Sequence, residues 1–323
     1  MRILVTGGTG FIGTHVLKQL GEKGHDVVCF DLAEPSALTR ELAPDATFVT
    51  GDISDPVSVA NTLARFDPDR VVHLAAMLGR GSQQHPRQAF EVNVDGTIGL
   101  LELTESHGID RVVAASSVSV YGDVPPDVDR LDETVPRRPN NVYGMTKTAV
   151  EHLGSTYQDR TGVEFAALQP VHGMGPGRLR GNVEDSFVVK AAVSGESLTV
   201  PIVEQPLEII YVEDTARAFV AAILADTLPH DTYLVGTGEY TTLTEIVELV
   251  RTHVPGANLE LGGERGADEL PAHPPTDTSR IREDLGWRPH YTISEALQTY
   301  VEWLDAHPDL WSFDAADAPW LDE

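Results

Sequence analysis

The segment Met1-Arg-Ile-Leu-Val-Thr-Gly-Gly-Thr-Gly-Phe-Ile-Gly13 decides the fold of this chain. Its apolar start predicts a buried strand, and the residues that follow the glycines, Ile12–Lys23, predict a helix. Gly7 allows the tight turn between them, Gly10 lets the backbone approach a pyrophosphate, and Gly13 lets the helix pack close to the strand. Because the first amides of that helix would face the phosphates, the sequence predicts a dinucleotide-binding turn.

An acidic residue indicates which dinucleotide this turn binds. The apolar run Val27–Phe30 predicts a second strand, and Asp31 follows it directly. A carboxylate at this position accepts hydrogen bonds from the adenosine ribose hydroxyls and repels a 2′-phosphate. The sequence therefore predicts NAD, rather than NADP, as the cofactor.

The segment Tyr143-Gly-Met-Thr-Lys147 predicts the reacting groups. Residues four apart share one face of a helix, so Tyr143 and Lys147 can reach the same bound ribose and nicotinamide. A free tyrosine titrates near pH ~10, and a neighbouring ammonium favours its phenolate. Ser117, which ends a predicted strand, could hydrogen-bond the same substrate oxygen. The alternative is an ordinary surface Tyr and Lys, but the chain has only four lysines, which favours a chemical role.

With these residues, the chain resembles the NAD-dependent epimerase/dehydratase family of extended short-chain dehydrogenases/reductases over nearly all of its length. The further segments that carry the resemblance are Gly51–Ile53, His73–Ala76, Asn93–Thr97, Ser116–Ser117, Gly175–Gly177, Tyr211–Asp214 and Leu285–Trp287.

The resemblance implies roles for residues around the cofactor. Asp52 and Ile53 would contact adenine, and Asn93 would support the helix that carries Tyr143. Two alanines, Ala75 and Ala76, would line the cofactor groove. The predicted cofactor residues are Gly7, Gly10, Phe11, Ile12, Gly13, Asp31, Asp52, Ile53, Leu74, Ala75, Ala76, Asn93, Tyr143, Lys147 and Pro170.

The alternation of apolar runs and amphipathic segments predicts an α/β fold, a Rossmann-type doubly wound parallel sheet with a smaller C-terminal α/β substrate domain. Residues 1–170 would form the NAD-binding domain, with a returning segment near 207–238, and residues 171–323 mainly the substrate domain. The expected strands are Ile3–Thr6, Val27–Phe30, Thr47–Thr50, Arg70–Leu74, Val112–Ser116, Phe165–Leu168 and Thr232–Val235, and the expected helices are Ile12–Lys23, Pro56–Phe66, Pro86–His107 and Val142–Gln158.

Three further features bear on function. The two long helices Pro86–His107 and Val142–Gln158 carry apolar residues on more than one face, which predicts a homodimer or higher homo-oligomer built on them. Thr242 and Glu245 form a capping box that opens a helix to Val254. Gly262–Thr276 is expected to be a polar loop, either folding over a ligand or merely connecting two elements.

Composition excludes several classes of function. The formal charge of −27 opposes binding to nucleic acid or to an anionic membrane surface, and no apolar run is long enough to span a membrane. We expect a cytoplasmic enzyme without a signal peptide, and the scattered histidines show no metal-ligand spacing. Strong acidity with so little lysine suggests a halophile, in which salt screens the self-repulsion, although an unusually acidic mesophilic protein is the alternative.

A cofactor with a Tyr–Lys–Ser site predicts hydride transfer coupled to proton transfer at a secondary or anomeric hydroxyl. One half-reaction is a dehydrogenase, and two on opposite faces of a rotated intermediate are an epimerase. Dehydratases of the family place an Asp-Glu pair after the active-site Ser/Thr, where this chain has Val118 and Ser119. Dehydration is therefore disfavoured. An NAD-sensing regulator is a remote alternative, because such proteins typically lack the Tyr–Lys pair.

The substrate handle separates the first two alternatives. Nucleotide-sugar enzymes of the family bind the diphosphate with arginines. At one position where the family usually has an arginine, this chain has Leu207. Glu208 follows it, and we expect its charge to repel a diphosphate. Two segments, His73–Gly96 and Glu208–Asp214, resemble the threonine dehydrogenase branch, which handles a small substrate. The interpretation is an NAD-dependent dehydrogenase of a small sugar-like substrate, with a UDP-sugar 4-epimerase as the alternative. The candidate substrate residues are Met77, Ser119, His172, Arg178, Arg180 and Arg265.

Overall fold

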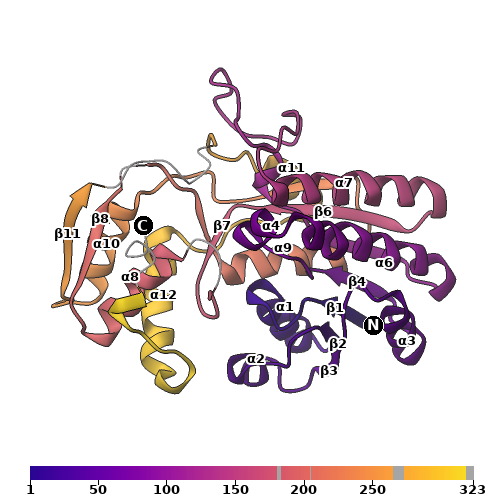
Figure 1. Cartoon of the computed structure of the whole chain (residues 1–323), viewed down its shortest axis with the longest axis horizontal. Helices are drawn as coiled ribbons and strands as arrows, with labels where there is room; N and C mark the ends of the chain where they lie inside the picture. Colours follow the sequence, from indigo (N-terminus) through magenta and orange to yellow (C-terminus); the bar gives the residue numbers. More distant parts are fainter. Residues whose placement is uncertain (180–182, 204, 265–272, 318–323) are drawn as a thin grey trace.

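The computed structural model describes residues 1–179, 183–203, 205–264 and 273–317. Within them the chain forms a large sheet flanked by helices and a smaller unit beside it (Figure 1). The large sheet has seven strands, all parallel, in the order β10-β6-β5-β4-β1-β2-β3. Their bounds are β1 Arg2–Thr6, β2 Asp26–Asp31, β3 Thr47–Thr50, β4 Arg70–His73, β5 Arg111–Ala115, β6 Glu164–Pro170 and β10 Thr232–Val235.

The predicted fold class is confirmed, and each of the seven expected strands forms. The order of the strands reverses between β1 and β4, which is the topological switch point of a doubly wound sheet. Ligands of such sheets bind in the crevice at the carboxyl ends of the strands that flank this point. The fold therefore places the glycine turn, which follows β1, at the usual position for a dinucleotide.

Both faces of the sheet are covered, and alternate residues of each strand explain why. In β1, Ile3 and Val5 pack with α1 (Phe11–Glu22) and α9 (Val212–Leu224) on one face. Leu4 packs on the other face, in the cluster that includes residues of α3, α6 and α7. A parallel strand is apolar on both sides for this reason. The bounds of these three helices are Pro56–Phe66, Gly96–Thr104 and Val142–Thr161.

The predicted helix over Pro86–His107 is confirmed in its bounds, but it is not a regular α-helix throughout. The segment divides into α5 (Pro86–Phe90), a π-helical turn η1 (Glu91–Asp95), α6 and a 3₁₀ turn η2 (Glu105–His107). A π turn inserts an extra residue into the hydrogen-bond ladder and rotates the side chains that follow. Here the turn contains Asn93, whose contacts are given below.

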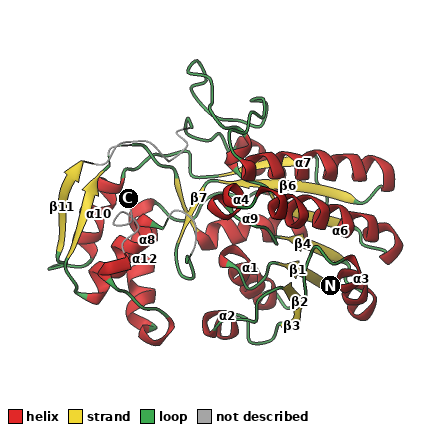
Figure 2. Cartoon of the chain, viewed as in Figure 1, coloured by secondary structure: helices red, strands yellow, loops and turns green. Residues whose placement is uncertain are grey.

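The smaller unit has its own core and two short parallel sheets (Figure 2). Strand β8 pairs with β11, and β7 pairs with β9. The elements of this part are β7 His172–Met174, α8 Glu184–Ser194, β8 Leu198–Ile202, β9 Ile209–Tyr211, α10 Leu243–His253, β11 Leu259–Glu264 and α12 Ile293–Ala306. Helix α10 begins with the predicted capping box between Thr242 and Glu245.

The expected polar loop Gly262–Thr276 is wrong at its start. Residues 262–264 belong to β11, because they continue the pairing with β8 through a register shift after Leu261. Residues 265–272 lie outside the described part of the chain. The remaining helices are α2 (Ala37–Leu42), α4 (Gly79–Gln84) and α11 (Ser279–Leu285), with short 3₁₀ turns.

After the first strands of the smaller unit the chain returns to the large sheet through α9 and β10. A fully buried arginine fixes this return: Arg111 Nη1 donates to the carbonyls of Ala222 at 3.0 Å and Ala225 at 2.5 Å. The same guanidinium pairs with Glu164 at 2.5 Å. A cation at the carboxyl end of a helix satisfies free carbonyls and opposes the helix dipole. We therefore retain the proposed division into an NAD-binding domain with a returning segment and a substrate domain.

Candidate functional site

The glycine turn is shaped so that two positions, Gly7 and Gly13, tolerate only glycine. Gly7 has a φ of +69°, and a Cβ there would lie 2.5 Å from the amide nitrogen of Ala75. A Cβ on Gly13 would collide with the carbonyl oxygen of Gly7. Gly10 is the N-cap of α1 and provides no side-chain cap, so the first amides of the helix are left to bind an anion. These residues fit the pyrophosphate of a dinucleotide.

Asp31 lies at the end of β2 with its carboxylate fixed by backbone amides. Thr9 N donates to one oxygen at 3.0 Å, and Ala33 N donates to the other at 3.1 Å. The first contact ties the acid to the glycine turn itself. The carboxylate is thus held beside the turn, where the ribose of an adenosine would have to pass, and its charge fits NAD better than NADP.

Asp52 and Ile53, the two predicted adenine contacts, have different surroundings in the structure. The Asp52 carboxylate accepts from Ser54 N at 2.9 Å and from Ser54 Oγ at 2.7 Å, so it closes a local turn. Ile53 is 6% exposed and packs beneath the sheet with Phe30. Contact of these two residues with adenine stays a prediction.

Tyr143, Lys147 and Ser117 are brought together at the carboxyl end of β5. Lys147 Nζ donates to the carbonyl of Ala115 at 2.8 Å and lies 5.7 Å from the centre of the Tyr143 ring. The Ser117 hydroxyl lies close enough to the Tyr143 hydroxyl to lower its pKa. Ser117 is also the N-cap of a 3₁₀ turn, accepting from Ser119 N at 3.1 Å. The structure therefore places the three predicted groups around one point.

The charges at this point oppose one another. Burial raises the pKa of Tyr143 to about 12, while the Arg178 guanidinium and the Ser117 hydroxyl act in the opposite direction. Burial lowers the pKa of Lys147 to about 8, and the carboxylate of Glu151 acts against that shift. Lys147 is therefore mainly protonated at neutral pH, and its charge favours the phenolate of Tyr143.

Asn93 links the π turn to the helix of Tyr143. Its side chain accepts from Met77 N at 2.7 Å and donates to the Met77 carbonyl at 3.0 Å. It also donates to Thr146 Oγ1 on α7 at 2.9 Å. The amide thus joins the loop after β4 to α7, which is the geometry expected of a supporting residue. Its contact with a cofactor stays a prediction.

Among the described candidate substrate residues, Ser119 and Arg178 contact or face the groups of this site. Met77 is held by Asn93, and the Ser119 hydroxyl accepts from Ser117 Oγ at 3.1 Å. Arg178 stacks on the ring of Phe11, 5.2 Å from its centre, and faces Tyr143. Arg180 and Arg265 lie outside the described residues.

His172 is paired with a buried acid that the sequence analysis missed. His172 Nε2 lies 3.1 Å from Asp185 Oδ1, and Asp185 is 2% exposed. Burial alone would raise the pKa of Asp185, but His172 and Arg178 hold it below its usual value. No sequence spacing marks this pair, because β7 and α8 meet only in the fold.

The structure gives Glu208 a role inside the fold, and its expected repulsion of a diphosphate stays a prediction. Glu208 is 3% exposed, and its two oxygens accept from the amides of Thr237, Gly238 and Thr276 at 2.8 Å and from Thr276 Oγ1 at 2.6 Å. Four donors already bind this charge, which fastens two loops. Leu207 packs against the core of the smaller unit.

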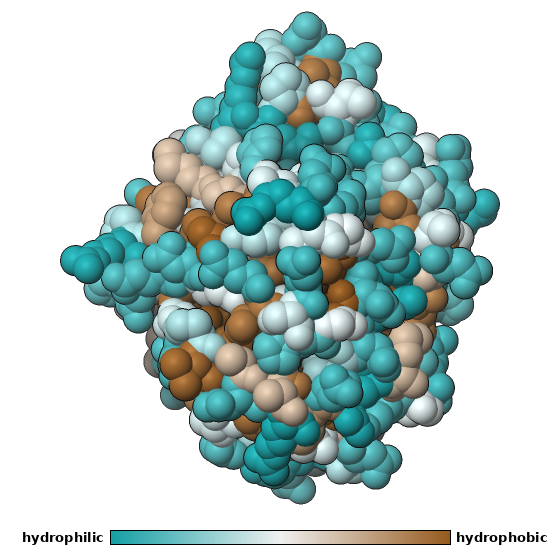
Figure 3. All heavy atoms as spheres, turned by 90° about the vertical axis from the view of Figure 1, so that its right-hand side faces the viewer, coloured by the Kyte–Doolittle hydropathy of each residue, from teal (hydrophilic) through white to brown (hydrophobic). Residues whose placement is uncertain are grey.

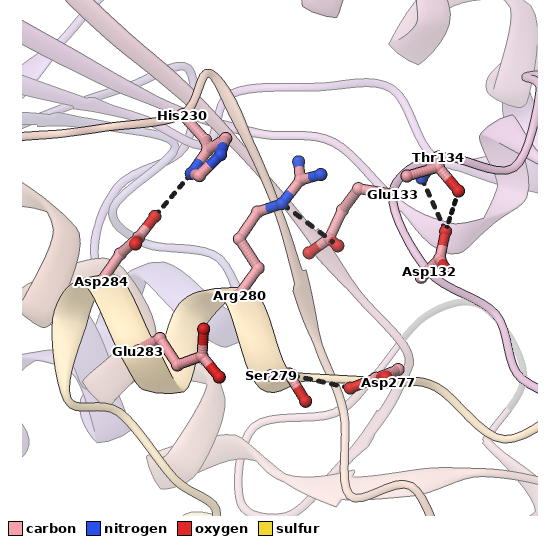
Figure 4. Close-up of a pocket in the computed structure, with 9 residues that line it drawn as sticks. All are labelled: Asp132, Glu133, Thr134, His230, Asp277, Ser279, Arg280, Glu283 and Asp284. Atoms are coloured by element: carbon pink, nitrogen blue, oxygen red, sulfur yellow. Dashed lines mark hydrogen bonds and ion pairs between the residues drawn. The ribbon is translucent and has the colours of Figure 1, made fainter.

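A hollow of about 290 Å³ lies elsewhere, between α11, His230 in the segment before β10, and the segment Asp132–Thr134 (Figure 4). Its carboxylates mostly have partners inside the fold: Asp284 binds His230 at 2.6 Å, and Glu133 accepts from Leu234 N at 2.8 Å. The hollow contains none of the predicted site residues. Among the described residues, no cluster of His, Cys, Asp and Glu could hold a metal ion.

Sequence reasoning also missed the side chains behind the Tyr–Lys pair. Glu151 follows Lys147 by the same four-residue spacing that links Lys147 to Tyr143, and it is 7% exposed. Gln169, in β6, is fully buried beside it. The spacing could have suggested Glu151, whereas Gln169 has no marker in the sequence.

Comparison with known proteins gives a consistent result. The model of the NAD dependent epimerase/dehydratase family matches residues 3–236. The chain is 31% identical to a UDP-glucose 4-epimerase of Streptomyces lividans, over 95% of this chain and 97% of the relative.

Solved structures are also similar over nearly the whole chain. A UDP-glucose 4-epimerase of Thermus thermophilus in complex with NAD superposes with a TM-score of 0.81 and 30% identity, covering 94% of this chain and 98% of that one. A UDP-glucose 4-epimerase of Thermotoga maritima with UDP-glucose superposes with a TM-score of 0.85 and 26% identity, covering 96% and 100%.

Proposed function

We propose that this chain, which belongs to the NAD dependent epimerase/dehydratase family, is a 4-epimerase of UDP-linked sugars. The cofactor of the family is NAD, and the chain is an NAD-dependent enzyme. The observation that most strongly supports a UDP-linked sugar as substrate is that the similarity to UDP-glucose 4-epimerases continues beyond the NAD-binding part of the chain. The superposition on the Thermotoga maritima UDP-glucose 4-epimerase covers 96% of this chain, so it includes most of the smaller unit.

This proposal replaces the dehydrogenase of a free sugar as the preferred interpretation. The argument for a free sugar depended on Leu207 and on the charge of Glu208. Glu208 is buried and bound by four donors, which weakens its part of the argument. Leu207 still leaves one position without an arginine, and this is the observation that favours the dehydrogenase as a second candidate.

The proposed chemistry is a proton transfer at Tyr143 coupled to oxidation at the sugar carbon. Bound NAD would supply the hydride acceptor, held by the glycine turn and by Asp31. Tyr143 Oη would take the proton of the 4-hydroxyl as C4 is oxidised, and would return a proton to the same oxygen when C4 is reduced again from its opposite face. Ser117 would hydrogen-bond that oxygen. Lys147 stays charged and stabilises the phenolate. A regulator without chemistry would not need this set.

Calorimetry with UDP distinguishes the two candidates. A UDP-sugar enzyme binds the nucleotide handle itself, so the proposal predicts a Kd for UDP on the order of micromolar, about −8 kcal/mol. Uridine, which lacks the phosphates, is the matched control and should bind much more weakly. Absence of UDP binding, together with NADH formation from a free sugar, would establish the dehydrogenase instead.

A further inference from the structure

The face of α7 that carries Tyr143 and Lys147 continues to a buried carboxylate. Glu151 lies four residues after Lys147, so the three side chains follow one another along one side of the helix. Glu151 is 7% exposed. A buried carboxylate costs free energy unless it is paired and hydrogen-bonded, so its partners are informative.

Glu151 accepts hydrogen bonds from three separate segments. Ser116 Oγ donates to Oε1 at 2.5 Å, and Gln169 Nε2 donates to the same oxygen at 2.7 Å. Arg137 Nε donates to Oε2 at 3.0 Å. Ser116 immediately precedes Ser117, so this carboxylate fastens the strand end that carries Ser117 to the helix that carries Tyr143.

The partners of Glu151 are themselves fixed. Gln169 accepts from the hydroxyl of Tyr121 at 2.9 Å, which leaves its amide oriented to donate to Glu151. The guanidinium of Arg137 lies 5.0 Å from the centre of the Tyr121 ring and also binds the carbonyl of Glu133 at 2.5 Å. The network is therefore closed on the side away from Lys147 and holds Glu151 in one position.

Within the described part of the chain, Lys147 has few neighbours that could hold its charge. It is 3% exposed, and its ammonium donates to one neutral group, the carbonyl of Ala115. Burial lowers the pKa of Lys147 to about 8, and Glu151 opposes that change. The other titratable groups around the pair are Tyr143 on α7, His73 on β4, whose pKa burial lowers to about 3, Arg178, which faces Tyr143, and Arg137, which faces Glu151.

We propose that Glu151 is a positioning residue of this site, which keeps Lys147 in its charged form beside Tyr143 and fixes the strand end that carries Ser117. It acts through Lys147 and Ser116. The inference rests on the proposed function in one respect, which is that Lys147 takes part in the reaction. The charge of Lys147 itself can be measured without substrate.

Selective ¹³C labelling of the lysine ε-carbons provides that measurement. The chain has four lysines, so the spectrum contains four titrating signals, and the signal that disappears in Lys147→Arg identifies Lys147. In Glu151→Gln the burial remains while the carboxylate charge is lost. The titration midpoint of Lys147 should then fall by about one pH unit. The signals of Lys18, Lys23 and Lys190 serve as internal references.

In a second variant, the titration midpoint of Lys147 should shift in the opposite direction. Arg137→Met removes the cation that balances Glu151, so the carboxylate acts more strongly on Lys147 and the midpoint should rise. A loss of general stability cannot produce opposite shifts in the two variants. Glu208→Gln is the matched control, because it neutralises an equally buried carboxylate that is not bonded to this network, and it should leave the Lys147 midpoint unchanged.

The pH dependence of turnover gives the functional readout. The alkaline limb of kcat should move to lower pH in Glu151→Gln, because Lys147 loses its proton earlier. An unchanged Lys147 midpoint in Glu151→Gln overturns the inference. Should that variant fail to fold, an unchanged midpoint in Arg137→Met overturns it alone. Failure of the proposed function would instead appear as missing epimerisation with the two midpoint shifts intact.

Discussion

Tyr143 by itself stays protonated at neutral pH, because burial raises the pKa of its hydroxyl to about 12. Its neighbours oppose that shift: the Arg178 guanidinium and the Ser117 hydroxyl lower the pKa of Tyr143, and Lys147 Nζ lies 5.7 Å from the ring centre. A base is most effective when its pKa lies near the working pH. At the residue scale, the activity therefore depends on how far these neighbours and a bound cofactor compensate for burial.

Tyr143→Phe tests that dependence. The change removes the hydroxyl and leaves the ring, so turnover should fall by ~100-fold or more while NAD affinity changes little. Tyr157→Phe is the control, because Tyr157 lies on the same helix with its hydroxyl directed to Glu102. Steady-state kinetics and NAD calorimetry measure the two effects. Activity of Tyr143→Phe within a few-fold of the parent would remove Tyr143 from the role of base.

Asp31 is expected to set the choice between NAD and NADP. Asp31→Asn removes the charge and keeps an acceptor for the amide of Thr9, so the glycine turn should stay ordered. Affinity for NADP should rise relative to NAD by about tenfold, because the repulsion of a 2′-phosphate is lost. Side-by-side calorimetry with both cofactors checks this. A parent protein that already prefers NADP would contradict the role of Asp31.

Individual site residues were predictable where a local pattern fixes their geometry. Tyr143 and Lys147 are one helical turn apart, and Asp31 ends an apolar strand, so short segments were sufficient. The buried role of Glu208 was not predictable, because its charge is visible in the sequence but its burial is not. The donors that bind it come from residues 237–238 and 276, which only the folded chain brings together.

At the element scale, the π turn η1 is the least regular part of the site. It lies between α5 and α6 and presents Asn93 to both Met77 and Thr146. Such turns occur frequently at functional sites, because they redirect one side chain without ending the helix. The turn explains how one residue can order the loop after β4 and the helix of Tyr143 together.

Asn93→Ala should damage both stability and turnover. The backbone amide of Met77 would lose its partner, while its carbonyl would keep only the bond from Ser82 Oγ, and the loss costs about 1–3 kcal/mol of unfolding free energy. Because the loop after β4 would loosen, we expect kcat to fall more than KM rises. Asn93→Asp retains the acceptor for Met77 N and should be intermediate. Chemical denaturation and kinetics measure these effects, and an Asn93→Ala protein with the stability and kcat of the parent would contradict this role.

The strands of the large sheet were predictable because buried parallel strands are continuous apolar runs, such as Val27–Phe30. The helix over Pro86–His107 was placed correctly but not its interruption, since a π turn leaves no mark in apolar spacing. The short strands β7, β8, β9 and β11 were missed. Their three to six residues are paired with distant segments, and local sequence provides little signal for such pairing.

At the scale of the whole molecule, charge is the dominant feature. The chain has 50 acidic residues against 23 lysines and arginines. Figure 3 shows one face on which hydrophilic residues predominate and apolar residues form small separate areas. Among the described residues, no helix is long and apolar enough to cross a membrane. Self-repulsion of so many carboxylates destabilises the compact state unless ions screen it.

Salt should therefore stabilise the protein. The Debye length falls from ~10 Å at 0.1 M to ~3 Å at 1 M, so the thermal midpoint should rise by about 5 °C or more between these KCl concentrations and then level off. The plateau in the thermal midpoint distinguishes charge screening from preferential exclusion of salt. Preferential exclusion would continue to raise Tm in proportion to the KCl concentration. Differential scanning calorimetry at constant pH measures the curve. A midpoint that is flat or falls over this range would contradict the expectation of salt adaptation.

We also predict a homodimer through the helices around Tyr143. Phe90 on α5 is 43% exposed and Met145 on α7 is 48% exposed, which leaves apolar surface on the elements expected at the interface. Light scattering should give twice the mass of the chain, and Phe90→Asp with Met145→Asp should shift it toward the monomer. Leu32→Asp, at an exposed apolar residue after β2, is the control. A monomeric parent protein would exclude this assembly.

The central claim is that this chain inverts C4 of a UDP-linked sugar, and an isotope experiment tests it most directly. UDP-galactose carrying deuterium at C4 is incubated with the protein, NAD below the substrate concentration, and ordinary water, and the products are read by NMR. The account predicts UDP-glucose that retains deuterium at C4, with no net NADH. A parallel sample contains a deuterated free sugar in place of UDP-galactose. UDP-galactose recovered unchanged, together with transfer of deuterium from the free sugar to NAD, would contradict the account.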